Sequence, residues 1–221
     1  MKTIKTIKTT IILVITLCFL TSCSTDDDTA SPTISAPSVT YSSTNVNATF
    51  FQEGNSTVPT VNWNGNQGAF SLASTINGLS INSTTGVLNW TKELAPDTYN
   101  LQVIATNSAG QTSINITIHN PLQGTFTGVY DDISFFEIQF NPDGSLELRA
   151  NDETNPTLAT GTWTLNSTNI LIDYTYDGGV DYSLSGTLTQ SATTATYAGD
   201  WFFNHGAVAA NQGGDFTMSM D

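Results

Sequence analysis

The sequence has few charged residues, and very few of these are basic. Lysine and arginine number 5 in 221 residues, against 19 aspartates and glutamates, and charged residues make up 11% of the chain, well below the roughly 25% of typical soluble proteins. A surface this acidic repels a phosphate backbone, so we expect no nucleic-acid partner. Threonine, serine and asparagine take the place of charge, and β-branched residues with frequent glycine favour β-structure.

Long apolar runs are also missing, and cysteine occurs only twice. The apolar segment Ile11–Leu20 has ten residues, whereas a hydrocarbon core requires about 20. It follows a lysine-bearing start and precedes a polar stretch, which is the order of a signal peptide. We therefore expect residues 1–22 to be a signal peptide rather than a membrane-spanning helix.

The junction Leu20-Thr21-Ser22-Cys23 resembles a lipobox, in which a small residue precedes the cysteine that receives diacylglycerol. The resemblance implies that Cys23 carries a lipid; the alternative is an ordinary cleaved signal with an incidental cysteine. Cys18 would leave with the signal, so the mature protein would contain no disulfide and would depend on packing. Lys92 and Arg149 would be its only basic residues, against all 19 acids, for a net charge of −17.

Residues 23–37 are rich in threonine, serine and aspartate and predict a flexible linker. Ser24 stands where an aspartate would favour the inner membrane in the Gram-negative sorting rule, so we expect the outer membrane. The acidic run Asp26–Asp28 resembles the surface-export tag of Bacteroidota lipoproteins, although a solvated linker explains it equally well. The expected location is the outer membrane, with the lipid on Cys23 as the membrane contact and the folded part facing the cell exterior.

Residues 38–120 contain short alternating apolar runs separated by Asn, Gly, Ser and Pro, which predict a β-sandwich. The clearest strands are Leu101–Thr106 and Thr112–Ile118, on either side of a hairpin loop at Asn107–Gly110.

The motifs of this segment resemble an Ig or cadherin-like repeat of bacterial surface proteins. They occur in the order Gly78-Leu79-Ser80-Ile81, Thr85-Gly86-Val87-Leu88, Asp97-Thr98-Tyr99 and Val103 to Gly110. Trp90 and Asp97 depart from the pattern, since glycine is common at both places. The resemblance implies a structural spacer or an adhesive domain.

Cadherin repeats bind calcium through clustered acidic residues, and calcium takes six to eight oxygen ligands. This segment offers only Glu53, Glu93 and Asp97, which are far apart in the sequence. We expect no cofactor, with calcium in this module as the alternative. Trp63 and Trp90 are candidates for stacking on a sugar ring, but their strand spacing from the preceding apolar residues favours a place in the core.

Residues 121–221 alternate apolar and polar residues with a period of two, which predicts antiparallel sheet with one face in water. Short turns join the segments, so each strand is expected to pair with the next. Eight strands with one apolar face each can close into a barrel, which removes exposed edges. The predicted strands are 124–131, 134–141, 145–150, 158–165, 169–176, 181–190, 194–203 and 214–221. The predicted fold class is therefore all-β, an Ig/cadherin-like β-sandwich followed by an eight-stranded antiparallel meander barrel.

The strand number, the opening Gly128-x-Tyr130 and the segment Gly213–Met220 resemble the lipocalin-like domains of bacterial lipoproteins. Glycine followed two residues later by a large residue recurs on the predicted inner face, where glycine allows a strand to bend. Many aromatic residues on that face favour a filled interior; the alternative is a ligand pocket at one mouth, covered by the loop 204–213. The predicted inner aromatic residues are Phe126, Tyr130, Phe136, Phe140, Trp163, Tyr174, Tyr176, Tyr182, Trp201 and Phe203. The ligand-binding candidates are Tyr130, Trp163, Tyr174, Tyr176 and Trp201, together with Trp63 and Trp90.

The sequence contains no recognisable catalytic constellation. Nucleophile-elbow, P-loop and dinucleotide motifs are missing, and His119 and His205 lack the spacing of a transition-metal site. Asp131 and Asp132 are candidates for a cation site, although solvated loop charge explains them more simply. We therefore expect a non-enzymatic outer-membrane lipoprotein that binds a glycan, a small ligand or a protein partner. The alternative is a structural or adhesive envelope protein with a solid barrel.

Overall fold

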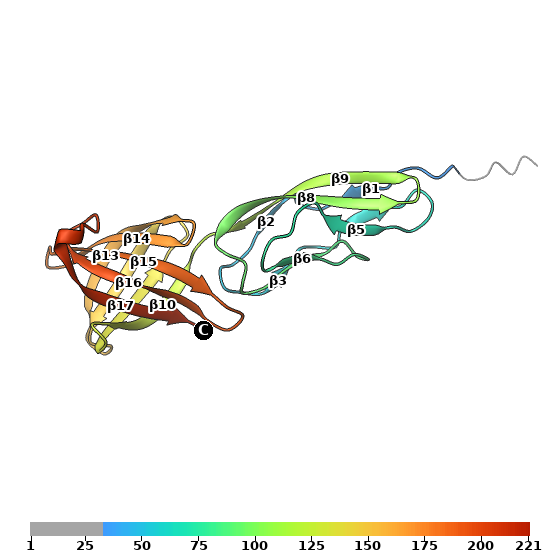
Figure 1. Ribbon diagram of the computed structural model, residues 1–221. Helices are drawn as coiled ribbons and strands as arrows, with labels where there is room; N and C mark the ends of the chain where they lie inside the picture. Colours follow the sequence, from blue (N-terminus) through green and yellow to red (C-terminus); the bar gives the residue numbers. More distant parts are fainter. Residues whose placement is uncertain (1–32) are drawn as a thin grey trace, which may run out of the picture. The chain divides into compact units, whose positions relative to one another are not determined.

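A computed structural model describes residues 33–221, which form an all-β protein of 17 strands and one 3-10 turn, η1 (Ala209–Asn211) (Figure 1). Residues 34–221 make up one compact unit. The expected signal peptide (1–22), Cys23 and most of the expected linker 23–37 lie outside the described residues. Within residues 33–221, no helix is long and apolar enough to cross a membrane.

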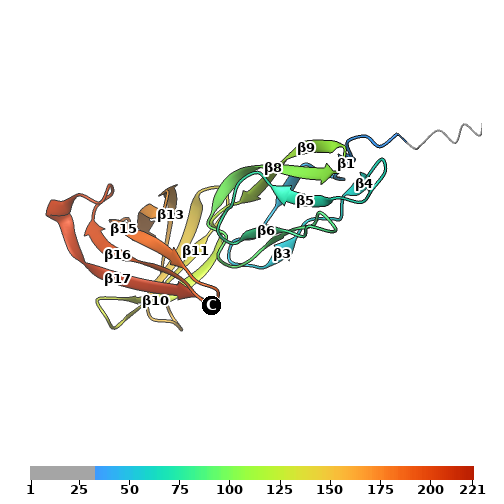
Figure 2. The ribbon, with the colours of Figure 1, turned by 45° about the vertical axis from the view of Figure 1, so that its right-hand side comes forward.

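The first nine strands form a β-sandwich, the sandwich module. Its larger sheet has the order β2-β9-β8-β5 and its smaller sheet the order β3-β7-β6, while β1 pairs with β4. Figures 1 and 2 show β8 and β9 in one layer and β3 and β6 in the other. The strands are β1 (Ser38–Thr40), β2 (Asn45–Asn47), β3 (Gly54–Asn55), β4 (Thr60–Asn62), β5 (Ala69–Leu72), β6 (Leu79–Ile81), β7 (Leu88–Trp90), β8 (Asp97–Asn107) and β9 (Gly110–Asn120).

The predicted hairpin of this module is confirmed, and its strands are longer than predicted. β8 and β9 pair along their whole length, from Asp97 opposite Asn120 to Asn107 opposite Gly110. The Asn107 side-chain oxygen closes the loop by accepting hydrogen bonds from the amides of Ala109 and Gly110, as asparagine commonly does in turns. Alternate residues of both strands enter a buried core that includes Phe70, Leu88, Leu101, Val103, Ile116 and Ile118.

The last eight strands form the predicted meander, closed into a barrel; this is the barrel module. Each strand pairs antiparallel with the next, and the first strand pairs with the last, Gly128 lying opposite Met218. Closure leaves no open sheet edge. The strands are β10 (Gly124–Tyr130), β11 (Ser134–Phe140), β12 (Ser145–Asn151), β13 (Thr157–Asn166), β14 (Asn169–Tyr176), β15 (Asp181–Gln190), β16 (Ala195–Phe203) and β17 (Gln212–Met220).

Two glycines on the inner face show why the curved wall needs that residue. A Cβ atom on Gly128 would lie 2.0 Å from the carbonyl oxygen of Thr217, and one on Gly161 would lie 2.2 Å from that of Asp173. Any other residue would collide with the neighbouring strand, so glycine allows the close approach that a small barrel requires.

The barrel interior is filled along most of its length by buried aromatic and aliphatic side chains. Phe126, Phe136, Phe140, Ile138, Ile172, Leu184, Tyr197 and Phe216 belong to one buried cluster. Phe50 and Phe51, which lie in a turn of the sandwich module, join the same cluster and are 2% and 4% exposed.

Phe203 is the exception among the predicted inner aromatic residues. It is 49% exposed, because it is the last residue of β16 and follows a register shift between Trp201 and Phe202. Its ring stays 5.0 Å from that of Trp201, at the rim of the barrel rather than inside it.

Candidate ligand-binding site at one end of the barrel

One end of the barrel, called the mouth here, opens into a cavity of about 280 Å³. The mouth is the end that carries the loops β10–β11, β12–β13, β14–β15 and β16–β17. Because the strands alternate in direction, the last residues of β10, β12, β14 and β16 all arrive there. The cavity is lined by Tyr130, Asp131, Phe136, Asn151, Tyr174, Tyr176, Tyr182 and Trp201.

Six of these residues form a continuous set of aromatic rings, called the aromatic belt: Tyr130, Phe136, Tyr174, Tyr176, Tyr182 and Trp201. Tyr174 lies directly opposite Tyr182 on the neighbouring strand, and their rings stack at 5.7 Å. Tyr176, two residues further on the same face, meets both rings edge-on, at 5.5 and 5.6 Å. Pairs of this kind stabilise each other beyond the area they bury, so the belt is held by its own packing.

Trp201 connects the belt to the one carboxylate of the cavity. Its indole Nε1 donates a hydrogen bond of 2.9 Å to Oδ1 of Asp131. Two glycines of β17 leave the space for this pair: a Cβ atom on Gly213 would lie 2.0 Å from the indole ring, and one on Gly214 would lie 2.0 Å from Oδ1 of Asp131. Asp131 and Asp132 both have positive φ, 48° and 65°, and the amide of Ile133 bonds back to the carbonyl of Tyr130, as in the tight turns that favour Asp and Asn.

Asn151 fixes the opposite side of the cavity. Its side-chain oxygen accepts a hydrogen bond from the Tyr130 hydroxyl, and its amide nitrogen donates one of 2.8 Å to the hydroxyl of Thr157. Its φ is 73°, a backbone conformation that asparagine tolerates better than most residues. Both polar ends of Asn151 are therefore used to hold the mouth in shape.

The phenols of Tyr174 and Tyr176 are neutral at ordinary pH. Burial raises the pKa of Tyr174 above its usual value, and the neighbouring Tyr176 adds to the effect. Burial also raises the pKa of Tyr176 to about 12, with a smaller contribution from Tyr130. Desolvation disfavours the phenolate in each case, so the cavity presents aromatic faces and hydroxyls together with one acidic side chain.

The loop 204–213, which the sequence offered as a cover for the mouth in the alternative with a ligand pocket, contributes no residue to the lining of the cavity. Its anchors are side chains of the outward-facing rows of β14 and β15: Ser183 accepts a hydrogen bond of 2.8 Å from the amide of Ala207, and Asp173 accepts one of 2.7 Å from that of Gly206. Ser183 also donates to the carbonyl of Asn204. The period of two puts Ser183 and Asp173 on the face opposite Tyr182 and Tyr174, so the loop folds onto the outer wall.

Four of the seven aromatic candidates thus meet in one cavity, and three lie elsewhere. Trp163 is at the other end of the barrel, where its Nε1 donates to the carbonyls of Asn141 and Ser145. Trp90 is 7% exposed in the core of the sandwich module. Trp63 packs against that core with its ring 5.2 Å from Phe70.

The acidic candidates separate from each other. Asp131 lines the mouth cavity, whereas Asp132 lines a depression on the outer wall with Asp215. Within residues 33–221 there is no group of three or more histidine, cysteine, aspartate or glutamate side chains placed to hold a metal ion.

Three residues that line the cavity were not among the ligand-binding candidates predicted from the sequence: Phe136, Asn151 and Tyr182. Phe136 and Tyr182 were on the predicted inner face, and the pairing of Tyr182 with Tyr174 follows from the short turn between β14 and β15. Asn151 gives no sequence signal, because its role depends on a left-handed backbone conformation at the end of β12.

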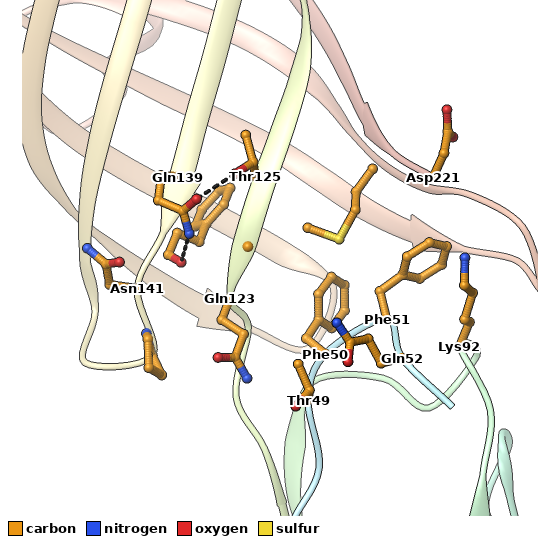
Figure 3. A pocket seen from close by; sticks show the side chains of 14 residues that line it. Thr49, Phe50, Phe51, Gln52, Lys92, Gln123, Thr125, Gln139, Asn141 and Asp221 are labelled. Atoms are coloured by element: carbon orange, nitrogen blue, oxygen red, sulfur yellow. Dashed lines mark hydrogen bonds between the residues drawn. The ribbon is translucent and has the colours of Figure 1, made fainter. Parts of the chain in front are cut away.

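A second hollow, of about 650 Å³, is larger but offers less to a ligand (Figure 3). It lies where the turn Thr49–Gln52 meets the barrel end opposite the mouth. Phe50 and Phe51 pack in the buried cluster of the barrel, and Nζ of Lys92 lies 4.4 Å from the centre of the Phe51 ring. The remaining lining is mostly amide and hydroxyl side chains, Gln52, Gln123, Gln139 and Asn141 among them, so no free aromatic face is presented there.

Comparisons with known proteins bear on the sandwich module. Residues 21–121 match the family described as "Putative Ig domain". An Ig-like domain indicates a structural or adhesive role for this part of the chain. No curated protein matches the chain in sequence.

Two solved structures of human protocadherin-24 EC1-2 are similar in a loose sense. The first has 9% identity and a TM-score of 0.38, and the second has 11% identity and a TM-score of 0.35; each match covers 85% of this chain and 94% of the protocadherin chain. At these low scores nothing about ligands or partners carries over.

Proposed function

We propose that this protein is a non-enzymatic, lipid-anchored binding protein of a bacterial outer membrane, and that its barrel takes a small ligand at the mouth. The observation that carries the proposal is the aromatic belt around one open cavity with a single carboxylate. Ligand sites are typically concave and mostly apolar, with a few convergent polar groups. The opposite end of the barrel is closed by Phe50 and Phe51, which leaves the mouth as the entrance.

The size of the cavity restricts the ligand. A volume of about 280 Å³ corresponds to roughly nine water molecules at about 30 Å³ each. This suits one sugar ring, one aromatic group or one compact alkyl head group, and a longer glycan or a protein segment would enter by its end only.

The anchoring part of the proposal rests on the sequence. A basic start, a ten-residue apolar segment and the Leu-Thr-Ser-Cys junction at Cys23 are the parts of a lipoprotein signal. Several acyl chains on one cysteine hold a protein durably, whereas one chain binds reversibly. The Ig-like module would then be a spacer between the lipid and the barrel. Replacing Cys23 by Ala is expected to abolish lipid labelling of the protein and its sedimentation with membranes.

The ligand proposal is tested by titrating the purified protein with a panel of monosaccharides, small aromatic compounds and alkylammonium salts. Binding is read by calorimetry and by the thermal unfolding midpoint. Trp201→Leu should abolish any binding found, because it removes a wall of the cavity. Trp63→Leu is the matched control, since it removes a tryptophan from the sandwich module. Binding that survives Trp201→Leu and is lost with Trp63→Leu would move the site out of the barrel.

A structural or adhesive protein with no small ligand is the second candidate. The Ig-like module and the filled barrel interior favour it. Adding calcium or a chelator to the same thermal measurement tests whether the sandwich module of such a protein binds calcium. No response to any ligand in the panel, with a clear shift on adding calcium, would favour this candidate.

A further inference from the structure

We propose that the ligand of the mouth cavity is an organic cation with an alkylated ammonium head. This inference rests on the small-ligand function proposed above and specifies its chemistry. Three features of the mouth lead to it: the enclosing rings, the sign of the surrounding charge, and the carboxylate of Asp131, which has no ion-pair partner among the described residues.

The aromatic belt surrounds the cavity rather than forming one flat platform. Tyr130 meets Phe136 edge-on at 5.5 Å and Trp201 at 6.4 Å, and Trp201 meets Tyr182 at 5.9 Å. These three pairs stand at steep angles, whereas Tyr174 and Tyr182 are nearly parallel at 19°. The six rings come from five different strands and line the cavity together. The electron-rich face of each ring attracts a cation, and sets of such rings recognise quaternary ammonium groups.

The charge around the mouth is negative. The β10–β11, β12–β13 and β14–β15 loops and the start of β15 carry six carboxylates: Asp131, Asp132, Asp152, Glu153, Asp177 and Asp181. The loops at the opposite end, 141–144, 167–168 and 191–194, carry only Asp143, and Asp221 follows the last strand there. The nearby Arg149 is already paired with Glu137, at 2.6 Å. Clefts lined by one sign of charge concentrate ligands of the other sign, so an anionic ligand is disfavoured.

Two hydrogen-bond donors of the cavity are already engaged within the protein. The Tyr130 hydroxyl donates to Asn151, and the Trp201 Nε1 donates to Asp131. Asp131 receives that neutral hydrogen bond but has no ion-pair partner among the described residues, whose ion pairs are Arg149–Glu137 and His205–Asp181. The cavity offers acceptor oxygens, aromatic rings and one negative charge without an ion-pair partner, and these together suit a cation.

The test compares choline with its uncharged isostere 3,3-dimethylbutan-1-ol and with methyl glucoside, by calorimetry at low and at physiological salt. Choline is expected to bind at least about tenfold more tightly than the alcohol, a difference of about 1.4 kcal/mol, and to weaken as salt is added. Asp131→Asn keeps a side-chain oxygen for the Trp201 N–H and removes only the charge. It should weaken choline binding about tenfold and leave the binding of the alcohol within twofold.

Asp132→Asn is the matched control, because it removes the same charge one residue away, from a side chain that lies on the outer wall. It should change choline binding less than about twofold, since the charge is solvated and screened. Near-UV circular dichroism of both variants verifies that the belt is intact.

The outcomes distinguish the two proposals. Equal binding of choline and its isostere, or an Asp132→Asn effect as large as that of Asp131→Asn, would overturn the cation inference and leave a small-ligand site. Tighter binding of methyl glucoside than of choline would replace the cation by a sugar. Absence of binding by all three probes and by the whole panel would overturn both proposals.

Discussion

Replacing Gly213 by Ala is expected to displace the Trp201 side chain and thereby to remove one wall of the mouth cavity. The backbone at Gly213 does not require positive φ, so alanine fits the chain itself. Its methyl group, however, would lie 2.0 to 2.5 Å from three ring carbons of Trp201. Real Cβ contacts do not reach such distances, so the indole must swing away and lose its bond to Asp131.

The expected loss of stability is the sum of the interactions that the displaced indole of Trp201 no longer makes. Its hydrogen bond to a charged oxygen contributes about 1.5 kcal/mol when partly solvated, and each edge-to-face pair, with Tyr182 and with Phe203, contributes about 0.5 to 1.5 kcal/mol. Alanine in place of glycine stabilises the folded protein by about 0.4 to 1 kcal/mol, because it lowers the conformational entropy of the unfolded chain. The free energy of unfolding should therefore fall by about 1.5 to 4 kcal/mol, and ligand binding at the mouth should be lost.

Urea unfolding followed by far-UV circular dichroism measures this change. Gly178→Ala is the control, because nothing lies within 4 Å of a Cβ atom there; it should be neutral or slightly stabilising. The decisive measurement is the double-mutant cycle with Trp201→Ala. Once the indole is gone, Gly213→Ala should be neutral or slightly stabilising as well. If Gly213→Ala is equally destabilising with and without the indole, the steric reasoning is wrong.

Three other predictions concern different parts of the molecule. Phe50→Ala should lower the free energy of unfolding of the barrel by about 3 to 5 kcal/mol, because Phe50 is buried against Phe126 at 6.2 Å; a urea midpoint equal to that of the unchanged protein would contradict it. Stability should fall from about pH 10 towards pH 12, because the unfolded phenols ionise near their ordinary pKa while burial raises the pKa of Tyr176 to about 12; alkaline unfolding with simultaneous appearance of phenolate absorbance checks this. Ser183→Ala should cost about 1 to 2 kcal/mol and speed amide exchange in residues 204–211, measured by mass spectrometry, since Ser183 holds that loop at two points; unchanged exchange would show that other contacts hold it.

The barrel could be predicted from the sequence because its strands and their pairing are specified by residues that lie close together along the chain. A period of two marks one dry face in each strand, and short turns force each strand to pair with its neighbour. The eight predicted segments therefore overlap β10 to β17 closely, and only the last begins two residues earlier than predicted, at Gln212. Glycines such as Gly128 were recognisable for the same reason, since they recur on the inner face at fixed spacing.

The cavity could be predicted only in part, because its geometry is long-range. That Tyr130, Tyr174, Tyr176 and Trp201 meet follows from closure of β10 on β17, which brings Asp131 beside residues some 70 positions away. The period of two does not say which end of the barrel stays open. Phe50 and Phe51, from a turn of the sandwich module, close the other end of the barrel. The sequence of that turn has no periodic pattern, so it does not show whether these two rings are buried or exposed.

The pairing of β10 with β17 also has a consequence for biogenesis. Seven of the eight ladders of the barrel join strands that follow each other along the chain and can form as hairpins while synthesis continues. The eighth ladder joins β10 to β17 and pairs Thr127 with Ser219. One edge of β10 therefore has no hydrogen-bond partner until residue 219 has been synthesised. The barrel therefore closes only when nearly all of its chain is available, and its last ladder joins the two strands that are farthest apart in the sequence of this module.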